Sequence, residues 1–301
     1  MTRQYGWTPD LPDPRDYILE KKSLIKKLVT FYPEELDLEP TCSDVEDQTV
    51  IGSCIAHGCV GSMEQIDRTD DDKWTELSRL FGYWILREDK EHDTGGQIRD
   101  AIKAIAKYGI CDEKLWPYDT NKFAVEPSFE AFHNAKKRKN IEYYRIADDN
   151  RYHGIMSTLV EERRLVIFGF TVFRNFEIPF NVDSAVLLMP TTQDLKLGVR
   201  GGHCIDIVGY KYFVIDGVKK LFFKCRNSYG KNWGINGYFW MEAEYIFDKN
   251  LCDDFWVITK VSFLKGDEPY DPIPSNAKWY IPVTSIVKGI VEIWKRIFGG
   301  K

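Results

Sequence analysis

The sequence contains no long run of apolar residues. No stretch approaches the ~20 apolar residues that a membrane-spanning helix needs, and residues 1–10 lack the ~7–15-residue apolar core of a secretory signal. These absences argue against a membrane-spanning or secreted protein. We therefore expect an intracellular, cytoplasmic location.

Regular cysteine spacing and an excess of basic charge are missing as well. The chain has 7 cysteines, an odd number scattered without a framework, which is typical of free thiols in a reducing compartment. Its 41 Lys and Arg against 46 Asp and Glu leave a net charge of −5, so no nucleic-acid partner is predicted. With 44% hydrophobic residues in 301, the chain has enough apolar material for one large core or two smaller ones.

Four segments follow one another along the chain. Residues 1–32 are predicted to form a leader, because residues 5–18 hold three prolines, show no periodicity and indicate an extended segment laid over a surface. Residues 33–140 are mainly helical, residues 141–265 mainly strand, and residues 266–301 a proline-rich linker and a helix.

The helical segment shows apolar residues at helical spacing. A central, buried helix is predicted to begin at Cys54, and two more helices are expected near 77–86 and 98–106, the last ended by Gly109. The second half carries short runs of β-branched and aromatic residues, at 165–173, 204–210, 212–215, 221–225, 238–240 and 255–258. Asp216-Gly217 marks a hairpin turn between two of them. A helical lobe followed by a strand lobe is an α+β arrangement.

The last segment carries an amphipathic stripe. Apolar residues recur at i, i+3 and i+4 over 283–298, and the opposite face holds Lys288, Lys295 and Arg296. A basic amphipathic helix of this kind is expected either to contact a membrane surface or a partner, or to pack on its own domain.

The most informative local feature is a cysteine at a predicted helix start with a glutamine six positions before it. The positive end of the helix dipole is expected to lower the pKa of the Cys54 thiol and favour the nucleophilic thiolate. The amide of Gln48 is placed to donate a hydrogen bond to the oxyanion that forms when the sulfur attacks a carbonyl. An acyl-transfer site then needs a histidine base and a group that orients it.

His203 is the best candidate for the base among the five histidines. It follows Gly201-Gly202 and opens a predicted strand, where its side chain can project into a groove. Asn227 ends another apolar strand and can accept a hydrogen bond from one imidazole nitrogen, leaving the other to face Cys54.

These motifs resemble the papain and cathepsin cysteine peptidases. The shared order is Gln48, Cys54, Gly201-Gly-His203 and then Asn227-Ser-Tyr-Gly-Lys-Asn-Trp233-Gly-Ile-Asn-Gly-Tyr238, over roughly residues 33–260. The resemblance implies a two-lobed fold, with a helical left lobe, a β-barrel-like right lobe and the active site in the cleft between them. The short leader is similar to those of microbial and large-DNA-virus relatives, so a viral source would make a virion-associated location the alternative.

The same resemblance implies substrate contacts. Gly95 and Gly96 match a glycine pair whose backbone binds the substrate strand, Gly202 adjoins the base, and Trp233 matches a tryptophan beside the leaving-group subsite. Tyr229 stands where the family has a tryptophan that covers the His-Asn hydrogen bond.

Three positions depart from the family pattern. Ile55 replaces the tryptophan that usually follows the nucleophile, and Ile51 and Asp93 replace two disulfide-bonded cysteines. Residues 252–258 are expected to form the floor of an apolar pocket. An insertion with paired histidines like that of cathepsin B is missing, which favours an endopeptidase acting on protein or peptide substrates without a cofactor.

Three alternatives stay open on the sequence. Cys54, His57 and Cys59 cluster groups that can bind zinc, although a second cysteine pair for such a site is missing. A protein with this fold can also act in binding without turnover, or as a transferase or ligase that resolves the same thioester with an amine. The leader is expected either to cover the cleft and delay activity or to strap the lobe surface.

Overall fold

The structure, a computed structural model, describes residues 3–18, 32–70, 74–177 and 185–263. The chain divides into two compact units, residues 1–266 and 267–301. The second unit, with the amphipathic helix predicted at 283–298, lies outside the described residues, as does most of the leader beyond Ile18.

Eight α-helices are described. They are α1 (Cys54–Asp70), α2 (Arg79–Leu86), α3 (Ile98–Tyr108), α4 (Phe129–Ala135), α5 (Arg151–Ser157), α6 (Arg174–Glu177), α7 (Thr192–Leu197) and α8 (Ala243–Phe247). Within the described part of the chain, no helix is long and apolar enough to cross a membrane.

Eight strands form one sheet in the described residues. They are β1 (Glu35–Asp37), β2 (Arg138–Arg145), β3 (Val166–Val172), β4 (Val186–Leu187), β5 (Gly201–Ile215), β6 (Val218–Arg226), β7 (Tyr238–Glu242) and β8 (Cys252–Phe263). The order is β2-β8-β3-β5-β6-β7-β4, with β1 paired to β5. The pairs are antiparallel except β4 with β7.

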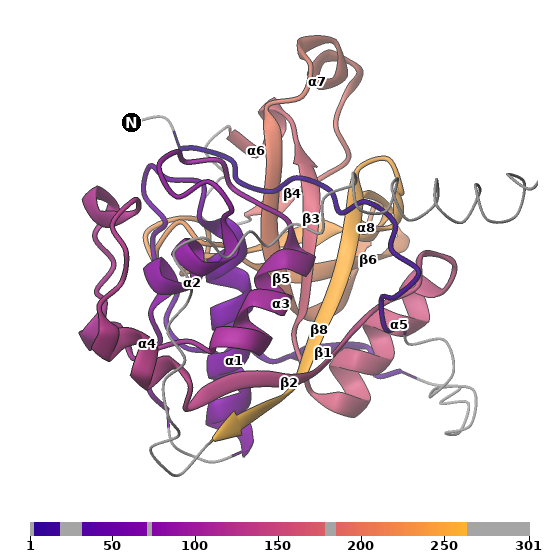
Figure 1. Cartoon of the computed structure of the whole chain (residues 1–301). Helices are drawn as coiled ribbons and strands as arrows, with labels where there is room; N and C mark the ends of the chain where they lie inside the picture. Colours follow the sequence, from indigo (N-terminus) through magenta and orange to yellow (C-terminus); the bar gives the residue numbers. More distant parts are fainter. Residues whose placement is uncertain (1–2, 19–31, 71–73, 178–184, 264–301) are drawn as a thin grey trace, which may run out of the picture. The chain divides into compact units, whose positions relative to one another are not determined.

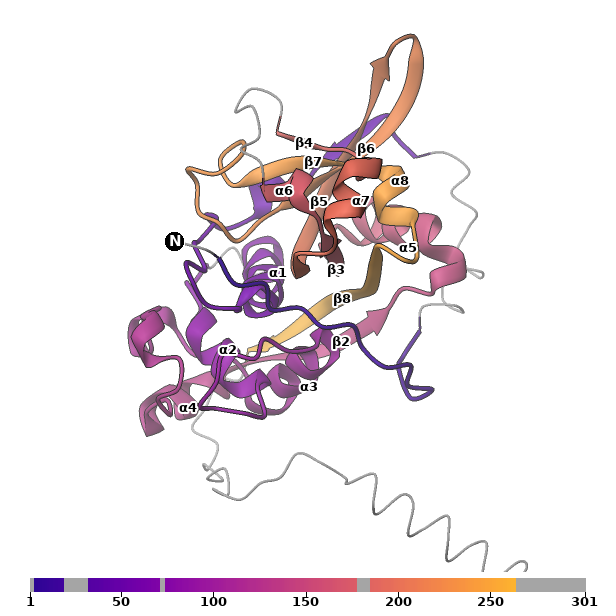
Figure 2. The ribbon, with the colours of Figure 1, turned by 90° about the horizontal axis from the view of Figure 1, so that it is seen from above.

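Helix α1 is the centre of the packing. Its residues from Cys54 to Asp67 are all buried, because α2 and α3 cover one side and β3, β5 and β8 the other (Figures 1 and 2). The predicted central helix is therefore confirmed. Its N-terminal residue faces the strand side, which places a thiol between the helices and the sheet.

The predicted α+β arrangement is confirmed, and the strand half differs from the expectation at one strand. The sheet runs from β2 to β4 as a path with two ends, so the described strands form an open sheet and not a closed barrel. The runs at 204–210 and 212–215 join into the single long strand β5, which turns into β6 through Asp216 and Gly217. These two residues have φ of 52° and 76°, the left-handed values that a tight hairpin of this kind requires.

Candidate active site

Cys54 begins α1 and is completely buried. Burial raises the pKa of its thiol to about 11, and the backbone N–H groups of Cys204 and Gly6 beside the sulfur offset only part of this effect. The expected lowering by the helix dipole is therefore wrong for this state of the molecule, because desolvation outweighs the partial charge of the helix end. The thiol is protonated at neutral pH while it stays covered.

The base candidate lies on the strand side of the same site. His203 is buried near the start of β5, and its Nε2 donates to Oδ1 of Asn227 at 2.8 Å. The backbone N–H of Ser228 donates to the same oxygen at 2.8 Å, which orients the amide. Nδ1 of His203 has no hydrogen-bond partner among the described residues, and Cys204, next in the chain, contacts the sulfur of Cys54. Asn227 thus holds one nitrogen of His203, and the other has no hydrogen-bond partner in the described part of the chain.

Burial also acts on the imidazole of His203. It lowers the pKa of this histidine to about 4, although the hydrogen bond to Asn227 works in the opposite direction. With the thiol pKa of Cys54 near 11, both groups are neutral at pH 7. The covered site therefore does not hold the thiolate and imidazolium that attack on a carbonyl requires.

Two hydrogen bonds to Ser228 hold Gln48 against the strand half of the molecule. Its backbone N–H donates to the carbonyl of Ser228 at 2.8 Å, and its side-chain oxygen accepts from the Ser228 hydroxyl at 2.6 Å. The amide nitrogen Nε2 donates to the carbonyl oxygens of Ile51 at 2.9 Å and of Gln4 in the leader at 3.1 Å. The proposed oxyanion donor is thus oriented by Ser228, and its Nε2 already binds a peptide carbonyl.

Aromatic rings enclose the histidine. The ring of Tyr229 lies 5.0 Å from that of His203 at 32°, and Trp233 meets Tyr229 edge-on at 5.6 Å. Phe176, at 5.7 Å from His203, also contacts Trp233. The phenol ring of Tyr229 therefore lies against the imidazole, and its role over the hydrogen bond between His203 and Asn227 stays a prediction.

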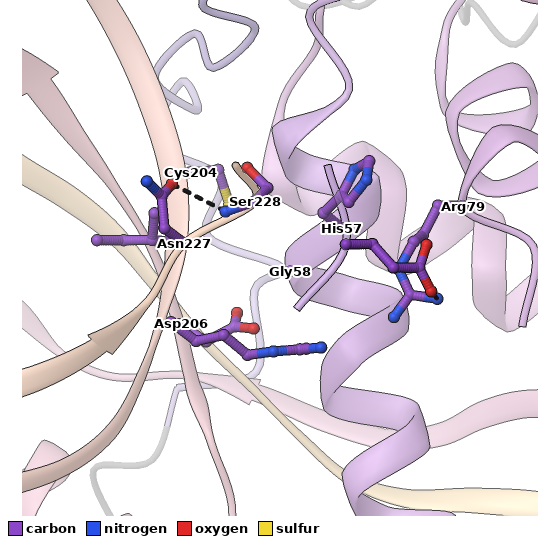
Figure 3. Close-up of a pocket in the computed structure, with 10 residues that line it drawn as sticks. His57, Gly58, Arg79, Cys204, Asp206, Asn227 and Ser228 are labelled. Atoms are coloured by element: carbon purple, nitrogen blue, oxygen red, sulfur yellow. Dashed lines mark hydrogen bonds and ion pairs between the residues drawn. The ribbon is translucent and has the colours of Figure 1, made fainter. Parts of the chain in front are cut away.

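A small cavity, lined mainly by polar residues that include Asn227, lies between α1 and the strands (Figure 3). Asn227 and Ser228 line it from the strand side, and His57 from the helix side. Nδ1 of His57 contacts the carbonyl oxygen of Ser53 at 3.0 Å, and burial lowers the pKa of this histidine to about 3. His57 is thus a neutral, buried residue, and no group of three metal-ligating side chains gathers among the described residues.

The described part of the leader, residues 3–18, crosses this site (Figure 2). The Trp7 N–H donates to the carbonyl of Gly202 at 2.9 Å, and Gly96 binds both neighbours: its N–H donates to Gly6 at 2.8 Å and its carbonyl accepts from Thr8 at 2.9 Å. The leader is extended here, as expected, and bridges Gly96 in the parallel direction. The glycine positions assigned to a substrate strand therefore hold a peptide strand of the chain itself.

The leader lies so close to the nucleophile that only glycine fits. A Cβ built on Gly6 would stand 1.8 Å from the carbonyl oxygen of Gly52, and one on Gly95 would stand 2.1 Å from the Gly6 oxygen. The backbone N–H of Gly6 faces the Cys54 sulfur. The leader therefore covers the thiol with a peptide group.

Trp7 anchors this strand. Its side chain is 7% exposed and donates a hydrogen bond through Nε1 to Asp254 at 3.1 Å. The indole lies directly against Gly169, so a Cβ at that position would stand 1.9 Å from the ring. Asp254 lies within the 252–258 stretch that we expected to form an apolar floor. Asp254 places a completely buried carboxyl group there, facing the indole, and the floor formed by residues 252–258 stays a prediction.

Asp93 takes over part of the role of the missing disulfide. Its carboxylate accepts from the Gly52 N–H at 3.0 and 3.1 Å and from the Tyr83 hydroxyl. Ile51, at the other lost cysteine position, is buried. The loop before Cys54 is thus tied to the loop before α3 by hydrogen bonds. Sequence reasoning identified the loss but not this replacement.

The comparisons with known proteins agree with this arrangement. The sequence model of the papain family cysteine proteases matches residues 32–253. The chain therefore belongs to the papain family and is a cysteine peptidase, so its substrates are proteins or peptides.

Individual relatives cover most of the chain. It is 32% identical over 304 residues to an uncharacterised peptidase C1-like protein, L477, of Acanthamoeba polyphaga mimivirus, spanning 92% of this chain and 90% of that protein. Xylellain, a cysteine protease from Xylella fastidiosa, has 33% identity and a TM-score of 0.71, covering 87% of this chain and 96% of that one. A digestive procathepsin L2 from Tenebrio molitor larval midgut, at 20% identity and a TM-score of 0.60 over 79% of this chain and 73% of that one, shares the fold.

Proposed function

We propose that the protein is an endopeptidase that cleaves through a thioester on Cys54 and whose leader keeps it inactive. The observation that carries the proposal is the leader strand itself: it is hydrogen-bonded to Gly96 and Gly202 and lies against the Cys54 sulfur. The site thus holds an extended peptide where a substrate has to lie.

The chemistry begins when the leader withdraws. Water then reaches the site, the desolvation that raises the pKa of Cys54 and lowers that of His203 decreases, and a proton can pass from the sulfur to Nδ1. Asn227 holds Nε2, so the imidazolium stays oriented toward the sulfur.

The thiolate then attacks the carbonyl carbon of the scissile peptide. The negative charge on the carbonyl oxygen is held by Nε2 of Gln48 and by the backbone N–H of Cys54, which as the first helical residue has no partner within the helix. His203 donates its proton to the leaving nitrogen as the C–N bond breaks. Water, deprotonated by the same imidazole, attacks the thioester, and the acid leaves with the thiol restored.

Substitutions in the full chain carrying Trp7→Ala, which we expect to release the leader, test this mechanism. Hydrolysis of a fluorogenic peptide mixture should be lost in Cys54→Ala, reduced ~10²–10³-fold in Gln48→Ala, and reduced in Asn227→Ala because the imidazole loses its orienting acceptor. Ser62→Ala, a buried α1 hydroxyl, serves as a matched control for changes in helix packing. Peptidase activity in purified Trp7→Ala, Cys54→Ala equal to that of Trp7→Ala alone would overturn the proposal.

A further inference from the structure

Beyond Trp7, the leader is held by a second cluster of contacts that centres on Arg99. Arg99 is the second residue of α3, and its side chain is 7% exposed. Its guanidinium binds the Asp16 carboxylate with two hydrogen bonds, from Nε at 2.8 Å and from an Nη at 2.5 Å. The other Nη donates to the Leu11 carbonyl at 2.7 Å. Such a bidentate pair is a strong and directional way to bind a carboxylate.

Asp10 occupies the same cluster from the other side. Its side chain is completely buried, its Oδ2 accepts from the indole N–H of Trp256 at 3.0 Å, and its Oδ1 accepts from the backbone N–H of Arg99 at 3.4 Å. Trp256 is 1% exposed. The cluster therefore consists of hydrogen-bond donors from Arg99 and Trp256, which bind the carboxyl groups of Asp16 and Asp10. It extends beyond the N-terminus of α3.

The donors on the body of the protein depend on the leader for their acceptors. Every hydrogen bond and ion pair that the structure gives the Arg99 guanidinium ends on a leader residue. When the leader withdraws, the Arg99 guanidinium and the Trp256 indole N–H lose these acceptors, and water replaces them. A carboxylate that enters this space can form the same bidentate, charge-assisted pair that Arg99 forms with Asp16, and such bonds are roughly twice as strong as neutral hydrogen bonds.

Neighbouring basic residues do not share this property. Arg145 keeps Asp253 at 2.8 Å and Asp254 at 3.0 Å without the leader. Lys103 is half exposed, and its nearest leader carboxylate, Asp13, is 3.9 Å away. Of these residues, Arg99 and Trp256 are therefore the ones that lose the acceptors of short hydrogen bonds when the leader withdraws. Lys103 offers a matched control.

We propose that Arg99 and Trp256, with the first turn of α3, form a subsite that binds an acidic side chain of the protein substrate once the leader has withdrawn. The leader binds there through its own aspartates and so imitates the substrate class. This inference rests on the proposed function and narrows it: the enzyme selects substrates that carry Asp or Glu at one position near the scissile bond.

The test measures kcat/KM for pairs of peptides cleaved by the full chain that carries Trp7→Ala. We expect this substitution to release the leader. The peptides differ only by Glu or Gln, scanned one position at a time on both sides of the scissile bond. At one position the Glu peptide should show a kcat/KM about tenfold higher, the effect of one charge-assisted hydrogen bond. Arg99→Gln should bring this ratio to about one, and Lys103→Gln should leave it unchanged.

One further variant keeps the result interpretable. Trp256→Phe, which keeps the bulk and removes the indole N–H, should lower the same ratio even if Arg99→Gln does not fold. A Glu-to-Gln ratio of one at every position overturns the subsite while the peptidase proposal stands.

If no peptide is cleaved, the proposed function fails, and binding then decides on the subsite. A labelled peptide with the sequence of residues 9–17 is titrated by fluorescence anisotropy into the same full chain. Binding at least about tenfold tighter than that of its Asp10→Asn, Asp16→Asn version supports the subsite, and equal binding overturns it.

Discussion

Replacing Trp7 by alanine is expected to uncover the nucleophile. The substitution removes a side chain that is 7% exposed, with its packing on Gly169 and its hydrogen bond to Asp254. A buried tryptophan replaced by alanine typically costs ~3–5 kcal/mol. Because Trp7 belongs to the leader, the loss acts mainly on the docking of the leader rather than on the core. The population with an open site should then rise ~10²-fold or more.

The reactivity of the Cys54 thiol reports this opening. With a thiol pKa of about 11 instead of the ordinary 9.0, the covered cysteine has about 100-fold less thiolate at neutral pH. We therefore expect a thiol-directed epoxide to modify Cys54 at least about 100-fold faster in Trp7→Ala than in the wild type at pH 7. Peptide mapping by mass spectrometry separates Cys54 from the other six cysteines.

A matched control lies in the same segment. Leu11→Ala changes a leader side chain that is 77% exposed and keeps the backbone carbonyl that Arg99 binds, so its modification rate should equal that of the wild type. If Trp7→Ala is modified no faster than Leu11→Ala while both have the thermal midpoint of the wild type, Trp7 does not hold the leader over Cys54 and the reasoning is refuted.

Three further predictions follow from individual contacts. Gly169→Ala places a methyl group where the Trp7 indole lies and should also speed modification of Cys54; an unchanged rate would show that the indole can move aside. Asp93→Ala removes the acceptor of the Gly52 N–H and should lower the free energy of unfolding by ~1–3 kcal/mol in urea titrations, with Asp93→Asn recovering part; equal midpoints would contradict a stapling role. Burial holds the pKa of His57 at about 3, so below pH 6.5 the unfolded chain binds a proton that the folded chain does not, and stability falls as the pH falls toward 3. His57→Gln should make that fall shallower by up to ~1.4 kcal/mol per pH unit, and a slope identical to that of the wild type would exclude this histidine as a cause.

Much of the fold follows from local patterns in the chain. The helix that begins at Cys54 and the hairpin at Asp216-Gly217 each depend on residues close in sequence, so periodicity and turn chemistry suffice to predict them. The sequence pattern predicts two strands in place of the long strand β5, because Lys211 interrupts the apolar run. The structure continues the strand there, since β1 and β6 both pair with that stretch.

Part of the candidate site can likewise be predicted from the sequence, and part cannot. The order of Gln48, Cys54, His203 and Asn227 is legible in the sequence because these residues sit at element ends with recognisable neighbours. The structure pairs His203 with Asn227, and the catalytic roles of all four stay predictions. Asp254 could not be identified, since its partner Trp7 lies 247 positions away and nothing local to either residue indicates a contact.

The sequence by itself determined the family, the order of the elements and the candidate catalytic residues, because these depend on short-range patterns. Only the tertiary structure decided the state of the site. The dipole of α1 favours a thiolate, yet the leader buries Cys54, and the cost of desolvation is larger. That balance depends on which distant segment covers the sulfur. Such packing is set by the glycines and carboxylates that the fold brings together, and a chain pattern does not record it.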